Sequence, residues 1–226
     1  MKTFQFRKEI WLWLIMFLPV LVFLFVDHRL PPRMAIHFDF RGRPNGFMAP
    51  GPFMLEMEGI GLGIYLLLLF VPRIDPKKQN YTLFAKTFFI FRATILLINA
   101  AITCLILMMG VGMIIHIDRI TILLISLLFM VLGNYLSNIR PNWFVGIRTP
   151  WTLSSEKVWK KTHQLGGRTF FFAGLVGFIL SLFLPNHVLL LAFPVLIGVA
   201  VLTPIIFSYL SYRKEANSAI SENQQP

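Results

Sequence analysis

The sequence predicts an all-α integral membrane protein with six transmembrane helices, and three observations lead to this fold class. Hydrophobic residues make up 56% of the 226 residues, and the mean hydropathy is +0.70. Charged residues make up only 14%, whereas soluble domains carry about a quarter. Six apolar runs approach or exceed the roughly 20 residues that cross a bilayer core. This composition excludes an ordinary soluble domain and makes the lipid bilayer the first partner.

The first apolar run covers residues 10–26 and follows a short basic segment. It ends in Val26-Asp27-His28-Arg29, and no small-residue cleavage site follows. We therefore interpret this run as an uncleaved signal anchor and not as a secretory signal peptide.

A short hairpin is predicted in the next loop, residues 27–52. Residues 36–40 alternate between apolar and polar side chains, which is typical of a strand. A turn signal follows these residues in Pro44, Asn45 and Gly46. The loop should therefore be a small ordered element outside the bilayer.

His37 and Asp39 would share one face of this hairpin, where they could bind a metal ion or act as acid and base. Two ligands are too few for a catalytic zinc, and His28 is a weak third. We interpret the pair as a structural hydrogen bond and predict no metal site and no catalytic residue. Cys104 is the single cysteine and lies in an apolar run, so no disulfide framework, thiol metal site or cofactor is predicted.

The other five spans are predicted by apolar runs at residues 53–71, 88–115, 120–136, 169–184 and 188–210. Small residues recur at intervals of four and predict close helix packing at Gly59, Gly63, Ala173, Gly177 and Ser181. Pro194 and Pro204 are expected to bend the last span. The segment after it, residues 213–226, is polar and is predicted to be disordered.

Three polar residues are informative because they lie inside predicted spans: Glu58, Arg92 and Asn134. Glu58 and Arg92 are expected roughly 15 Å apart in depth, too far for a direct pair. Arg92 shares its depth with Asn134, which favours a polar cluster near the inner surface. The other interpretation, that Arg92 extends its side chain to the interface, stays open. Asn99 is expected to make a hydrogen bond between helices.

The longest stretch that is not lipid-soluble covers residues 144–167. Ser154 is a good helix N-cap and Glu156 suits the first turn, so a short helix should follow. At 100° per residue, one face carries Lys157, Lys160, Lys161 and Gln164, and the other carries Val158, Trp159, Thr162, His163 and Leu165. We expect this amphipathic helix to lie in the membrane interface and to end at the Gly166-Gly167 pair.

Lys and Arg residues are distributed unequally over the predicted loops. Of the 21, the N-terminus, the loops 72–87 and 137–168 and the C-terminal tail hold 15, whereas the other three loops hold 5. The positive-inside rule then places both termini in the cytoplasm of a multi-pass protein of the cell membrane. The same bias explains the pI of about 10.2, so no direct nucleic-acid binding is predicted.

Two segments carry a resemblance. Residues 133–168, with the strings IRTPWTL and VWKKTH, resemble the signature of the SdpI family of bacterial membrane immunity proteins. Residues 32–46, PRMAIHFDFRGRPNG, resemble a domain of unknown function that often precedes the SdpI region. The chain is accordingly divided into an N-terminal domain (1–75), an SdpI-like four-helix region (76–212) and a tail (213–226).

The resemblance implies protection against a secreted antimicrobial peptide toxin, and it adds a cytoplasmic transcriptional repressor as a further partner. A soluble partner would read the stretch 144–167, whose candidate binding or signalling residues are Arg148, Thr149, Pro150, Trp151, Lys157, Trp159, Lys160, Lys161 and His163. The alternative is a small membrane transporter or enzyme that uses Glu58, Arg92 and the pair His37 and Asp39. Sequence favours immunity, because no acid lies at mid-depth in a span and no nucleophile with a base can be assembled.

Overall fold

The computed structural model describes residues 6–39 and 43–223. Six helices are long and apolar enough to cross a membrane, as predicted, so the chain is an all-α multi-pass membrane protein. These are α1 (Phe6–Val26), α2 (Pro50–Ile74), α3 (Ala85–Gly110), α4 (Ile117–Leu136), α6 (Glu156–Phe183) and α7 (Asn186–Asn223). The short elements are η1 (Asp27–Arg29), β1 (Met34–Phe38), β2 (Pro44–Met48), η2 (Lys78–Thr82) and α5 (Pro150–Ser154).

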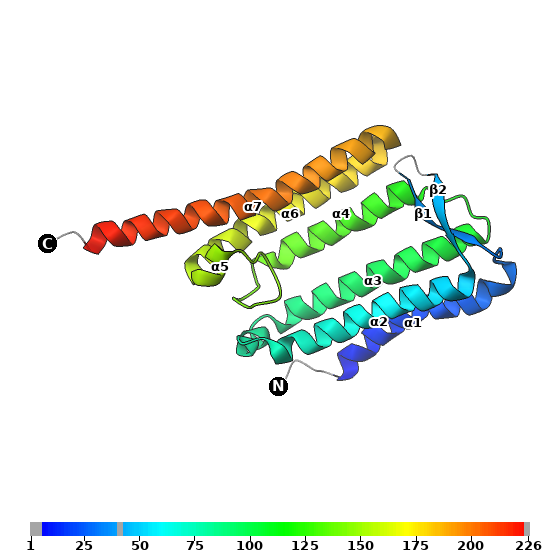
Figure 1. Cartoon of the computed structure of the whole chain (residues 1–226), viewed down its shortest axis with the longest axis horizontal. Helices are drawn as coiled ribbons and strands as arrows, with labels where there is room; N and C mark the ends of the chain where they lie inside the picture. The colour runs from blue at the N-terminus through cyan, green and yellow to red at the C-terminus, as the bar shows by residue number, and fades with distance from the viewer. Residues whose placement is uncertain (1–5, 40–42, 224–226) are drawn as a thin grey trace.

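The helices form two groups that lie side by side (Figure 1). The first group contains α1, α2 and α3, and the second contains α4, α5, α6 and α7. The β hairpin lies at one end of the bundle, which we call the hairpin end. At the opposite end α1 begins and α7 ends; we call it the basic end because it carries η2, α5 and most of the Lys and Arg residues.

The two groups meet at the basic end in a cluster of buried apolar and aromatic side chains. Its members come from α2, η2, α3, α4, the loop after α4, and α6: Val71, Tyr81, Phe84, Phe88, Phe91, Leu136, Ile139 and Trp159. Rings pack closely inside it, since the centroids of Tyr81 and Phe84 are 4.9 Å apart. This cluster therefore joins residues 71–91 of the first helix group to residues 136–159 at the start of the second group's loop and α6.

The predicted hairpin is present as the antiparallel pair β1–β2, but the turn lies earlier than predicted. Pro44, Asn45 and Gly46 belong to β2, where Gly46 pairs with His37. A Cβ added to Gly46 would lie 2.8 Å from the His37 Cβ. The Pro-Asn-Gly string therefore serves a close approach within the strand pair, and it does not form the turn.

The third span was predicted too late in the chain: α3 covers Ala85–Gly110, whereas the apolar run suggested 88–115. Its first turn contains Lys86 and Thr87, which an apolar criterion rejects although they are compatible with a helix. The chain then leaves the helix before Gly112, whose φ of +94° belongs to the left-handed region that favours glycine.

The predicted stop at Gly166-Gly167 is wrong, because α6 runs through both residues to Phe183 as one helix. A Cβ on Gly167 would lie 2.9 Å from the carbonyl oxygen of Gly133 in α4. Gly167 thus allows two backbones to approach, which is the other common use of glycine in a membrane helix, and Gly166 leaves room for the Ile147 side chain. The cap is also shifted by one residue: Ser155, not Ser154, accepts the hydrogen bond from the Val158 amide.

The tail prediction is wrong up to Asn223, since α7 continues as helix from the sixth span to that residue. A helix that is already formed extends at low cost through good helix formers such as Arg213, Lys214 and Ala216. Ser155 also donates a hydrogen bond of 3.0 Å to Glu215, which ties this extension to the start of α6.

Candidate functional site at the basic end

The candidate site is the loop between α4 and α5, residues 137–149, together with the helices that hold it. Asn142 organises this loop and is fully buried. Its Oδ1 accepts hydrogen bonds from the amides of Phe144 (2.9 Å) and Val145 (2.6 Å). Its Nδ2 donates to the carbonyl oxygens of Arg140 and Val145, both at 2.9 Å. One side chain therefore replaces the backbone pairing that an irregular loop lacks.

The connection between α2 and α3 supplies a second anchor for the loop. Asp75 is 2% exposed and accepts hydrogen bonds from the Tyr81 hydroxyl and from the Trp143 amide, both at 2.9 Å. The Tyr81 hydroxyl also lies 3.3 Å from the Asn142 Oδ1. Burial, followed by the hydrogen bond and the negative charge of Asp75, raises the pKa of Tyr81, so its hydroxyl stays a donor. Asn80 adds a 2.7 Å bond to the Pro141 carbonyl oxygen.

The start of α6 closes the loop from the other side. The Trp159 indole N–H donates to the Ile139 carbonyl oxygen at 2.9 Å. The His163 ring stacks on Trp159 with a centroid distance of 4.1 Å, and its Nε2 accepts the Ile147 amide at 3.0 Å. Since Nδ1 faces the Trp159 carbonyl oxygen at 2.9 Å, His163 is neutral with its proton on Nδ1.

Gly146 is required where the loop passes over this histidine. Its φ is +110°, and a Cβ there would lie 2.4 Å from the His163 Nε2. A side chain at this position would be strained and would also displace the imidazole. Gly146, near the start of the stretch 144–167, is therefore needed for the path of the loop.

The helices α5 and α7 form the last wall. Thr149 and Thr152 form a capping box at the start of α5, and the Thr149 hydroxyl lies 3.0 Å from that of Ser208 in α7. Trp151 packs on Tyr209 with a centroid distance of 5.0 Å. The loop, α5 and α7 are thus one ordered unit.

The structure divides the predicted partner-binding residues into two sets. The buried set consists of Thr149, Trp159 and His163, which face the protein interior. The exposed set consists of Arg148, Pro150, Lys157, Lys160 and Lys161, and Trp151 is half-buried. The faces of the amphipathic segment are therefore as predicted, but its apolar face packs on protein, so the expected docking on the membrane interface is wrong. The reason is that the segment is continuous with the α6 span, which directs it along the bundle.

The described loop residues at the hairpin end make separate hydrogen bonds and do not converge on one site. The His37 Nδ1 is hydrogen-bonded to the Asn45 Oδ1, and the Asp39 carboxylate accepts the Arg43 amide at 2.9 Å. The His28 Nε2 accepts a hydrogen bond from the Arg29 Nε at 3.2 Å. Among the described residues no group of three His, Cys, Asp or Glu side chains could hold a metal ion.

Arg92 belongs to a buried polar cluster, as one interpretation predicted, but the predicted partner Asn134 is wrong, and so is the interpretation that its side chain extends to the interface. Arg92 is 4% exposed and makes a bidentate ion pair with Glu9 of α1, with distances of 2.9 and 2.7 Å. Asn134, its expected neighbour, is exposed on α4, and Glu58 lies half-buried in α2. The expected hydrogen bond of Asn99 is present, since its Nδ2 donates to the Met57 carbonyl oxygen at 3.4 Å.

Four residues on which the site and its supporting bundle depend were not predicted from the sequence: Glu9, Asp75, Tyr81 and Asn142. Glu9 directly precedes the apolar run 10–26 and lies outside the range that an apolar criterion selects. Asp75 and Asn142 each lie beside a proline, Pro76 and Pro141, where a buried polar side chain often replaces missing backbone bonds. A polar residue directly beside a proline was thus the sequence feature that could have identified Asp75 and Asn142.

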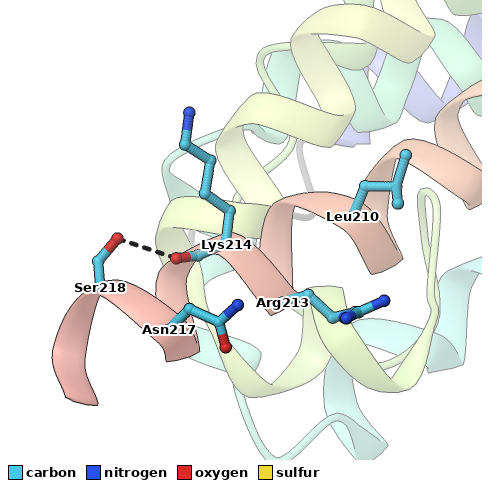
Figure 2. Close-up of a pocket in the computed structure, with 5 residues that line it drawn as sticks. All are labelled: Leu210, Arg213, Lys214, Asn217 and Ser218. Carbon is cyan, nitrogen blue, oxygen red and sulfur yellow. Dashed lines mark hydrogen bonds between the residues drawn. The ribbon is translucent and has the colours of Figure 1, made fainter. Parts of the chain in front are cut away.

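The extension of α7 carries a hollow of about 460 Å³ lined by Leu210, Arg213, Lys214, Asn217 and Ser218 (Figure 2). Figure 2 shows Arg213 and Lys214 extending in different directions, and Ser218 donates to the Lys214 carbonyl oxygen at 2.9 Å. These cations do not converge, so this hollow is a weaker candidate than the loop.

Comparisons with known proteins match two separate regions of the chain. Residues 138–208, which include most of the loop, α5 and α6, match the SdpI/YfhL protein family. Residues 14–57, which include the hairpin, match a domain of unknown function, DUF1648. The chain is 24% identical over 208 residues to Immunity protein SdpI of Bacillus subtilis (strain 168), covering 92% of this chain and 97% of that protein. No solved structure gives a significant match. Residues 138–208 are thus similar to the SdpI/YfhL protein family, and a region similar to DUF1648 lies in front of them.

Proposed function

We propose that this chain is a membrane immunity protein that protects its own cell from a secreted antimicrobial peptide, and that it is not an enzyme. The observation that carries the proposal is the similarity to Immunity protein SdpI over nearly the full length of both chains. A match of that extent includes both the hairpin and the loop 137–149, so it does not rest on shared apolar helices alone.

The orientation that fits this role places the basic end in the cytoplasm. The positive-inside bias supports it, since the segments at that end hold most of the Lys and Arg residues. The hairpin end then faces the peptide. Apolar side chains are exposed there on β2 and on the loop after α3, with Phe47 49%, Met113 55% and Ile114 94% exposed. An amphipathic peptide would contact these side chains before it enters the bilayer.

The opposing function, a transporter or membrane enzyme, would need the polar residues to act together. Arg92 is instead paired with Glu9, His37 with Asn45, and Asp39 with the Arg43 amide. Among the described residues these pairings leave Arg92, His37 and Asp39 in three separate contacts, which argues against a shared transport or catalytic site.

A cytoplasmic repressor is the finer part of the proposal and rests on the family resemblance. The surface available to it is the rim of the loop and α5, where Arg148, Pro150 and Lys161 are exposed. The buried Asn142 network would keep this rim in one conformation, which lowers the cost of binding. A repressor gene among the neighbouring genes is expected, and a catabolic operon in its place would argue against this role.

Protection is tested by expressing the chain in a peptide-sensitive strain and measuring survival and membrane potential under the peptide. Cells with the wild-type chain should survive, and the double variant Phe47→Ser and Ile114→Ser should lose protection at an unchanged amount of membrane protein. The control variant Ile74→Ser removes a residue that is 62% exposed at the basic end and should protect fully. A cysteine at Asn45 that is labelled from outside checks the orientation in the same cells. Death of wild-type-expressing cells at the concentration that kills empty-vector cells would refute the proposal.

A further inference from the structure

A cavity of about 840 Å³ lies beside the loop at the basic end, between the two helix groups. Its walls come from the end of η2 and the start of α3 (residues 82–87), from the chain after α4 (residues 137–141), and from four residues at the start of α6, which are Glu156, Lys157, Trp159 and Lys160. This volume is within the range of about 300 to 1,000 Å³ that is typical of small-molecule sites. Part of the lining is apolar, since Phe84, Ile139 and Trp159 are each at most 3% exposed and contribute to it.

The charged lining is strongly unequal. Four cations, Lys86, Arg140, Lys157 and Lys160, line the cavity together with one anion, Glu156. The ion pair between Arg92 and Glu9 is the salt bridge found in the described part of the chain, so none of the four cations is neutralised by a described carboxylate. Like charges gathered around a hollow repel one another, and an anion between them would remove that repulsion.

The start of α3 adds backbone donors to the same wall. No side chain caps this helix, and its first turn holds no acidic residue. The first amides of a helix have no partner within the helix, and the helix dipole favours an anion there. Thr87, which is 4% exposed and lines the cavity, brings a hydroxyl to the same turn. The anion-binding character of the wall thus comes from both side chains and backbone.

The depth of the cavity indicates the source of the anion. The helix α4 has 20 residues and is therefore about 30 Å long, which equals the thickness of the hydrocarbon core. The cavity is lined by the residues that directly follow α4, so it lies at the level of the lipid headgroups. Its apolar floor matches the first methylene groups of the acyl chains, and its cationic rim matches the phosphate of a phospholipid.

We propose that this cavity binds the phosphate-bearing headgroup of an anionic phospholipid, with Lys86, Arg140 and Lys160 contacting the phosphate. This site goes beyond the proposed function and does not depend on it. It also gives separate roles to the lysines of α6: Lys157 and Lys160 line the cavity, whereas Lys161, one position further along the helix, does not.

The test uses the full-length protein purified in a neutral detergent, with phosphatidylglycerol, phosphatidylcholine or inorganic phosphate added. Thermal melting and lipid binding by native mass spectrometry are measured for each. Phosphatidylglycerol should raise the melting temperature, and phosphatidylcholine should not. The variant with Lys86→Gln, Arg140→Gln and Lys160→Gln should lose phosphatidylglycerol affinity by at least about tenfold, since each cation near an anionic lipid contributes measurably.

A matched control removes three exposed cations at the same end that do not line the cavity: Lys78→Gln, Lys161→Gln and Lys214→Gln. This control should keep the wild-type affinity, and both variants should melt as the wild type does without lipid. Equal loss in both variants would show general charge attraction and overturn the site. Inorganic phosphate that stabilises as well as the lipid would show a site for a free anion. Failure of the lipid to stabilise the wild type would also overturn the proposal, whatever the outcome of the protection assay.

Discussion

The helices inside each of the two groups are joined by different contacts, although both groups cross the same lipid bilayer. In the first group the strongest contact is polar: Arg92 of α3 binds Glu9 of α1, and the Tyr65 hydroxyl of α2 donates to the same carboxylate at 3.1 Å. The Trp13 indole N–H extends this network to Tyr65 at 3.0 Å. Three helices are thus joined through one buried charge pair.

In the second group small residues allow close backbone packing, and Arg119 of α4 adds hydrogen bonds to the carbonyl oxygens of Ser181 (2.9 Å) and Leu184 (2.8 Å) at the end of α6. A Cβ on Gly133 of α4 would lie 2.3 Å from the Phe171 nitrogen of α6, and one on Gly174 would lie 2.5 Å from the Ser126 carbonyl oxygen. By contrast, Gly59 and Gly63 in the first group have no atom within 4 Å of such a Cβ, so the described residues do not show the packing predicted for them. Lipid tails are as apolar as leucine, so helices associate either through polar bonds or through close backbone packing. A buried charge pair is central to the first group, whereas the second combines close backbone packing with the hydrogen bonds of Arg119.

The largest effect should come from the first group. The variant Arg92→Leu leaves Glu9 buried without its partner and should lower the free energy of unfolding by about 3 to 5 kcal/mol. The double variant Arg92→Leu with Glu9→Leu removes both charges and should recover most of that loss. Unfolding in bicelles, compared over the full double-mutant cycle, measures the coupling. Additive losses in the double variant would show that the pair is not what holds the three helices.

A smaller effect is expected in the second group from Gly133→Ala. The added methyl meets backbone atoms of α6 and cannot be avoided by a rotamer change, so the variant should lose about 1 to 3 kcal/mol. Gly59→Ala is the matched control, because the same change there meets nothing and gains helix propensity. Melting temperatures of the two variants in one detergent make the comparison. A Gly59→Ala loss as large as that of Gly133→Ala would remove the distinction between the groups.

The smallest effect is expected for Asn99→Leu, which removes the bond from α3 to the Met57 carbonyl oxygen of α2. Hydrogen bonds between membrane helices contribute about 0.6 kcal/mol on average, because the unfolded chain in the membrane also finds partners. The bond is long at 3.4 Å, so a loss near or below that value is expected. The same unfolding measurement checks it. A loss that approached that of Arg92→Leu would show that polar strength in the first group is spread over several residues.

The sequence predicted the features that depend on local composition. Six apolar runs were enough for six spans, and alternation at 36–40 was enough for the hairpin. The lysine face of the segment after Ser155 followed from helical geometry, and those lysines are exposed. Periodicity determines which residues share a face, because it depends on the backbone of one helix only.

The features that were missed depend on partners far away in the chain. Arg92 binds a residue 83 positions earlier, and Asn142 bonds to Tyr81 across 61 positions. Nothing in the local pattern ranks Glu9 above Asn134 as a partner. The apolar face of residues 158–163 illustrates the same difficulty, since lipid and a protein wall accept the same side chains. Glycine was ambiguous for a related reason: Gly166-Gly167 suits a helix end or a close contact, and only the opposing α4 decides.

The ion pair between α1 and α3 also has a consequence during synthesis. At about 5 to 20 residues per second, the ribosome makes Arg92 roughly 4 to 17 seconds after Glu9, which lies 83 positions earlier. During that interval the carboxylate of α1 has no guanidinium to bind, and the cost of an unpaired charge in hydrocarbon keeps this end of the helix at the water boundary. The third helix therefore sets the time at which the first reaches its final depth, and the N-terminal half of the protein is completed only when Arg92 has emerged.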